Sequence, residues 1–205
     1  MDRDGGPGRG GDPRADERAD DAAHGGHDAR YGGGAATSAG ISATATVTVL
    51  AAGKPLYVAN EVFGSSITVY APGASGNATP TATIAGDNTG LSFPFGVALD
   101  GAGNIYVTNS ASSVGGSNSI TVYAAGASGN ATPAATIAGG NTGLDFPTGI
   151  ALDGTGNIYV GNSGGNITVD GSITVYAAGA SGNATPMVTI AGSNTGLTNP
   201  TLITF

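Results

Sequence analysis

The feature that most constrains this chain is an internal repeat of 53 residues. The pentapeptide Ser-Ile-Thr-Val-Tyr occurs three times at that spacing, at Ser66–Tyr70, Ser119–Tyr123 and Ser172–Tyr176. The segments 66–118 and 119–171 are identical at 37 of 53 positions, and their last eight positions all differ. A tandem repeat of this length indicates one supersecondary unit per repeat, which buries its core by stacking on its neighbours.

Each repeat contains four short runs that are rich in β-branched residues and tyrosine. In the last full repeat these runs are 149–152, 157–161, 172–177 and 186–191. An Asp-Gly turn that begins at Asp153 joins the first two runs, as one that begins at Asp100 does in the preceding repeat, and such turns favour hairpins. Four consecutive strands with turns between them predict an antiparallel meander, which as a repeated unit is typical of a β-propeller blade.

We therefore predict an all-β protein, a β-propeller of four-stranded antiparallel blades with about three blades plus one extra strand. The blades are expected at about 45–92, 93–145 and 146–198, with the first strand of the first blade at about 45–51 and the extra strand at 201–205. A parallel β-solenoid is the alternative architecture, but the Asp-Gly reversals favour the propeller.

Three blades are too few for a closed ring, because closed propellers have about four to eight. The chain is then either a fragment of a larger propeller or a protein that associates with itself, as a homodimer or head-to-tail. Two copies would supply six blades.

Composition separates an N-terminal tail from the repeats. Residues 1–36 hold five of the six basic residues, eight of the 14 acidic residues and both histidines, without any apolar run. We expect this tail to be disordered and residues 37–205 to form the blades. The tail lacks the apolar core of a secretory signal, and we expect no membrane span. A formal net charge of −8 argues against a nucleic-acid partner.

Aromatic residues recur at the repeat spacing. Tyr70, Tyr123 and Tyr176 end the pentapeptides, where packing between neighbouring blades needs a large side chain. Phe93 and Phe146 precede prolines in the connections between repeats, and we expect them to fill the gap between blades.

The segments LDGAGNIYVTN (99–109) and LDGTGNIYVGN (152–162), with the three pentapeptides, resemble bacterial NHL-repeat and YVTN-type propeller repeats. The likeness covers about residues 45–205 and implies a propeller fold. Because many bacterial members of these families are exported, it also implies an extracellular or cell-envelope location. Known relatives include protein- and RNA-binding scaffolds, lactonases and a lyase, so the resemblance implies no single activity.

The repeats offer little catalytic chemistry. Residues 37–205 contain no histidine or cysteine, one glutamate (Glu61) and one lysine (Lys54). A general base that works near neutral pH is usually a histidine or a perturbed carboxylate. We predict no cofactor and no metal site, and we expect a non-catalytic interaction module. A propeller-type hydrolase or lyase completed by oligomerisation and a non-functional propeller fragment are the alternatives.

The expected binding surface consists of the loops that follow the second strand of each repeat. The resemblance implies that these loops share a face with the connections between blades. The loops at 61–65, 110–118 and 163–171 are polar and differ among the repeats, which suits a protein or glycan partner, although neutral drift would produce the same variation. The candidate binding residues are Asn60, Glu61, Asn109, Asn162 and Asp170.

Overall fold

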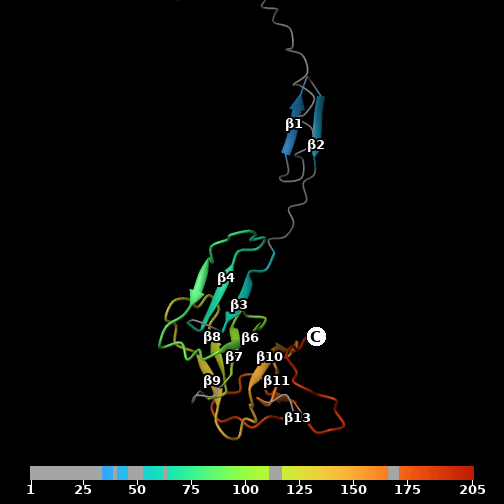
Figure 1. Cartoon of the computed structure of the whole chain (residues 1–205). Coiled ribbons are helices and arrows are strands. Elements are labelled where there is room, and N and C mark those ends of the chain that lie inside the picture. The colour runs from blue at the N-terminus through green and yellow to red at the C-terminus, as the bar shows by residue number, and fades with distance from the viewer. Residues whose placement is uncertain (1–33, 39–40, 46–52, 62–63, 111–116, 166–170) are drawn as a thin grey trace, which may run out of the picture. The chain divides into compact units, whose positions relative to one another are not determined.

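The computed structural model of the chain describes residues 34–38, 41–45, 53–61, 64–110, 117–165 and 171–205 (Figure 1). The chain separates into two units, Met1–Ala52 and Gly53–Phe205. In the first unit, β1 (Gly34–Ser38) pairs with β2 (Ile41–Ala45) in an antiparallel hairpin.

The boundary between tail and repeats stays a prediction. Residues 34–36, which the prediction places in the tail, belong to β1, and the unit that carries the repeats begins at Gly53. The charges that predicted disorder stop at Arg30, so composition gives no reason for the tail to continue to residue 36. The remainder of the predicted tail lies outside the described residues.

The second unit contains three antiparallel sheets, one for each repeat. The first consists of β3 (Leu56–Asn60), β4 (Ser66–Tyr70) and β5 (Ala82–Ile84). The second consists of β6 (Pro94–Leu99), β7 (Ile105–Asn109), β8 (Ser119–Tyr123) and β9 (Ala135–Ala138). The third consists of β10 (Pro147–Leu152), β11 (Ile158–Asn162), β12 (Ser172–Tyr176) and β13 (Val188–Ile190).

Within each of these sheets the strands pair in chain order, which confirms the all-β class and the antiparallel meanders (Figure 1). The antiparallel pairing rules out the parallel solenoid as the arrangement of the described strands. The described part of the chain holds no helix that is long and apolar enough to cross a membrane.

The reversals between the first two strands of the second and third sheets are the predicted Asp-Gly turns. The N–H of Gly103 donates to the carbonyl of Asp100 over 3.0 Å, and that of Gly156 donates to the carbonyl of Asp153 over the same distance. These turns set the register of the hairpins, in which Leu99 pairs with Ile105.

Of the two strands predicted at the limits of the repeats, the structure describes only the second. The strand expected at about 45–51 lies outside the described residues, except that Ala45 is the last residue of β2. The prediction of an extra strand at 201–205 is wrong, because these residues form no strand. No strand edge in the described part of the chain pairs with them, and the segment is held instead by the Thr148 hydroxyl, which donates to the carbonyl of Pro200.

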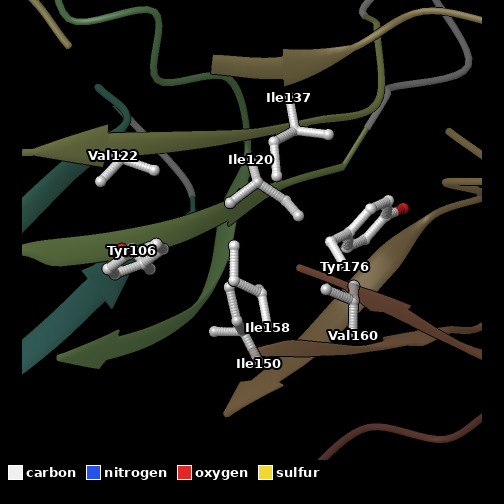
Figure 2. Close-up of a cluster of buried hydrophobic side chains, with 8 residues drawn as sticks. All are labelled: Tyr106, Ile120, Val122, Ile137, Ile150, Ile158, Val160 and Tyr176. Atoms are coloured by element: carbon white, nitrogen blue, oxygen red, sulfur yellow. The ribbon is translucent and has the colours of Figure 1, made fainter. Parts of the chain in front are cut away.

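The three sheets of the second unit pack face to face, the first on the second and the second on the third. The core between the first two contains Ile67, Ile84, Ile105, Val107 and Tyr123. Figure 2 shows the core between the second and third sheets, which contains Tyr106, Ile120, Val122, Ile137, Ile150, Ile158, Val160 and Tyr176. Successive side chains of a strand point to opposite faces, so the middle sheet has two buried faces. All residues of β7 and β8 are buried, whereas all residues of β13 are exposed.

Two of the pentapeptide tyrosines confirm the predicted core role and also tie neighbouring sheets together. Tyr123 and Tyr176 are fully buried. The hydroxyl of Tyr123 donates to the carbonyl of Thr89 over 2.6 Å, and that of Tyr176 donates to the carbonyl of Thr142 over 2.6 Å. Burial raises the pKa of both phenols, so they remain neutral donors at physiological pH.

Candidate functional site

The loops that follow the second strand of each repeat lie against the connections that lead to the next sheet. In the first repeat, the backbone N–H of Phe93 donates to the Ser65 hydroxyl over 3.2 Å. In the second repeat, the Asn118 side-chain amide donates to the carbonyl of Leu144 over 3.2 Å. In the third repeat, the N–H of Gly171 donates to the carbonyl of Leu197 over 2.8 Å. Loops and connections therefore form one continuous surface in each repeat, which we call the loop face.

A hollow of about 690 Å³ opens on the loop face of the first repeat. Its lining combines two exposed carboxylates with apolar and small residues: Glu61, Gly64, Ser65, Gly86, Asp87, Gly90, Leu91 and Phe93. None of these described lining residues is basic, so the two carboxylates make the field in the hollow negative. Carboxylates beside an apolar surface can accept hydrogen bonds from sugar hydroxyls or pair with cationic side chains.

The backbone at Phe93 is strained, and its left-handed conformation recurs at the same position of the other repeats. Phe93 has φ of 47°, and the residues at the same repeat position, Phe146 and Asn199, have φ of 48° and 51°. A bulky residue in the left-handed region is uncommon and costs on the order of 1–3 kcal/mol. The conformation turns the chain sharply before the following proline, and it places the Phe93 ring, 39% exposed, at the hollow.

Two of the predicted binding residues, Asn109 and Asn162, are buried and belong to the framework. The amide Nδ2 of Asn109 donates to the Thr121 hydroxyl over 3.1 Å, and its Oδ1 accepts the N–H of Ser92 over 3.1 Å. Asn162 makes the matching contacts with Thr174 and Asp145, each over 3.1 Å. The structure therefore gives both residues a framework role, because their polar atoms are used inside the protein.

The other three candidates differ from one another. Asn60 is half-buried, and its amide donates to the hydroxyls of Thr68 (3.2 Å) and Ser66 (3.3 Å), so it too supports the loop. Glu61 is exposed and lines the hollow. Asp170 lies outside the described residues.

The turn carboxylates have lowered pKa values because of local hydrogen bonds. The Thr155 hydroxyl, the Asn157 amide and the N–H groups of both residues hold the pKa of Asp153 well below its ordinary value. Partial burial opposes ionisation of Asp100, but hydrogen bonds from the side chain and backbone of Asn104 outweigh it and lower that pKa. These bonds explain both carboxylates as turn formers.

Sequence reasoning missed Asp87 and Phe93 as members of the site. A usable signal was present for Asp87, since its repeat counterparts are Gly140 and Ser193 and a deviation from a repeat marks a local role. The position of the Phe93 ring depends on its left-handed backbone, which the sequence does not reveal.

Nothing in the described residues gathers three or more histidine, cysteine, aspartate or glutamate side chains in a metal-binding group. No protein-family model matches the chain, and no curated protein is significantly similar to it.

Proposed function

We propose that the three sheets are consecutive blades of a β-propeller and that the chain is a non-catalytic interaction module. Its partner is a protein or glycan, which binds on the loop face at the hollow lined by Glu61 and Asp87. The likeness of the repeats to NHL and YVTN-type repeats supports the blade assignment. Face-to-face stacking of one meander per 53-residue repeat supports it further.

The observation that carries the proposed function is the hollow itself. It pairs carboxylates from two different loops with the apolar surfaces of Leu91 and Phe93, on a framework whose polar groups are internally satisfied. A rigid scaffold that presents adaptable polar groups is suited to recognition, and a small number of polar groups on an apolar floor provides specificity.

The test is a nuclear magnetic resonance titration of the ¹⁵N-labelled full chain with a lysine-rich peptide and, separately, with a panel of neutral oligosaccharides. We expect saturable shifts in the segments 64–65 and 86–93 with one of the two probe classes. Shifts with the peptide identify a basic protein segment as the partner, and shifts with a saccharide identify a glycan.

The paired substitution Glu61→Gln with Asp87→Asn should weaken that binding about tenfold or more, because it removes both charge-assisted acceptors. Asp145→Asn removes one charge from the corresponding connection of the next repeat and serves as the matched control. The proposal fails if neither probe class shifts the hollow, or if the paired variant and the control behave alike.

A further inference from the structure

The outer face of the third sheet carries an apolar side chain whose repeat counterparts are buried. Ile190 is 45% exposed, whereas Ile84 and Ile137, at the same position of the first and second sheets, are 0% exposed. Ile84 and Ile137 are buried in the cores shared with the following sheet. The third sheet thus presents the same side chain toward a position that no described residue fills.

The first sheet carries a hollow at the complementary position. About 370 Å³ in volume, it is lined by Leu56, Tyr70 and the loop 74–78. Leu56 is 60% exposed, although its counterparts Ile105 and Ile158 are 0% exposed. In the second sheet, Ile105, Tyr123 and the corresponding loop alanines pack in the core that contains Ile84.

The two junctions between sheets also share one set of backbone contacts. At the first junction, the N–H of Ala85 donates to Gly129 over 2.9 Å, and that of Gly129 donates to Thr83 over 2.7 Å. At the second, the same two bonds join Ala138 and Thr136 to Gly182, over 2.9 and 2.7 Å. The chain therefore uses one docking geometry twice.

Asparagine side chains complete this set. Asn130 accepts the N–H of Asn88 over 2.8 Å, and Asn183 accepts the N–H of Asn141 over 2.8 Å. Together with the bonds from Tyr123 to Thr89 and from Tyr176 to Thr142, these contacts define what one sheet needs from the next.

The first and third sheets each hold one half of these junction contacts. On the first sheet, the Tyr70 hydroxyl and the exposed Asn77 side chain make no hydrogen bond within the described part of the chain. On the third sheet, the corresponding partners are the carbonyl of Thr195 and the N–H of Asn194. The two halves are complementary in the order of their hydrogen-bond donors and acceptors, and the exposed Ile190 corresponds to the hollow beside Leu56.

We propose that a second copy of this chain docks its first sheet on the third sheet of the first copy. Ile190 enters the hollow beside Leu56 and Tyr70, the Tyr70 hydroxyl donates to the carbonyl of Thr195, and Asn77 accepts the N–H of Asn194. The occupant is a second copy because its groups match at the spacing the chain already uses at both internal junctions. Two copies provide six sheets, within the range of about four to eight for a closed ring, so we expect a head-to-tail dimer.

The first test measures the mass of the purified full chain by sedimentation, with circular dichroism to verify folding. We expect a complex of two copies, reduced to a monomer by Ile190→Lys or by Asn77→Lys. Both residues are exposed in the single chain, so neither lysine disturbs its core. Ala177→Lys is the matched control. Ala177 is exposed, and its counterpart Ala124 is exposed even in the middle sheet, so this variant should dimerise normally.

The second test mixes the two monomeric variants. The Asn77→Lys chain keeps an intact third sheet and the Ile190→Lys chain keeps an intact first sheet, so mixing should restore a one-to-one complex through the single remaining interface. Tyr70→Phe removes one hydrogen bond at each of the two interfaces of the dimer, so it should weaken dimerisation by about five- to a hundredfold. A monomeric wild-type chain at high concentration, a dimer that survives Ile190→Lys, or variants that do not pair on mixing would each overturn the proposal.

Discussion

The asparagines that end the second strand of each repeat show how one side chain can join a strand to a connection. Asn109 reaches across the sheet to Thr121 and at the same time accepts the N–H of Ser92. It is fully buried, so every one of these bonds is made without competing water.

We expect Asn109→Ala to reduce the free energy of unfolding by about 2–3 kcal/mol, because it leaves the buried Thr121 hydroxyl and the half-buried Ser92 N–H without this partner. Urea denaturation followed by circular dichroism measures the loss. Asn60→Ala, which removes the half-buried counterpart, should cost less. Equal and small losses for both variants would contradict this account of the network.

The turn carboxylates predict an acid dependence of stability. Their folded-state pKa values are lower than the ordinary value of 3.8, so they stabilise the folded chain above that pH. The contribution is lost as pH falls from about 4 toward the lowered folded-state values, because the unfolded state binds protons first. The double variant Asp100→Asn with Asp153→Asn should have a flatter profile of melting temperature between pH 6 and pH 2. Parallel profiles for variant and wild type would refute the assignment.

Residue roles were only partly predictable from the sequence. The sequence correctly predicts that Asp100 and Asp153 form turns, because an Asp-Gly turn depends only on residues that are close in the sequence. The sequence predicts a binding role for Asn109 and Asn162 and does not reveal their burial, because the direction of a side chain at a strand end depends on the neighbouring strand. The invariant threonines at 68, 121 and 174, which accept these amides, were the available clue.

Strands formed where the sequence predicts them when a short turn joins them to a neighbouring strand. The hairpins around Asp100 and Asp153 formed as predicted, whereas residues 201–205 formed no strand despite their likeness to 95–99. A strand requires a partner edge, and repeat position alone does not provide one.

Close packing between the first strands of neighbouring sheets depends on glycine. A Cβ at Gly96 in β6 would collide with the backbone carbonyl of Thr148 in β10. A Cβ at Gly149 in β10 would lie 2.8 Å from the Cα of Leu202, which belongs to the segment after the last sheet. We expect Gly96→Ala to cost about 1–3 kcal/mol in unfolding free energy, since backbone cannot move aside as a flexible side chain can. Gly101→Ala is the control, because a Cβ there would have no atom of a residue beyond its chain neighbours within 4 Å. Chemical denaturation that finds the two variants equally stable would contradict the collision.

At the scale of the whole second unit, burial decreases from the middle sheet outward. The residues of β7 and β8 are all buried, and those of β13 are all exposed. Stability of a repeat stack is approximately a sum over units and their interfaces, so a sheet with one neighbour is held less firmly than a sheet with two.

Amide hydrogen exchange should reveal this gradient. At a dilution where the chain is monomeric, we expect β7 and β8 to exchange most slowly and β13 to exchange fastest among the strands of the second and third sheets. Raising the concentration should protect β13 selectively if a second copy covers it. Uniform exchange across the three sheets would show that they open as one unit and that the gradient in burial has no energetic counterpart.

The three pentapeptide strands β4, β8 and β12 are identical, and that redundancy affects how the chain reaches its native state. During refolding, each of these strands presents the same side chains to a pairing strand. A strand can therefore pair with the wrong sheet, either within one molecule or between two. The flanking strands, which differ in sequence among the three sheets, and the lengths of the connections distinguish the native arrangement from these swapped ones. The redundancy therefore limits how often the strands pair correctly during refolding, more than it limits the stability of the native state.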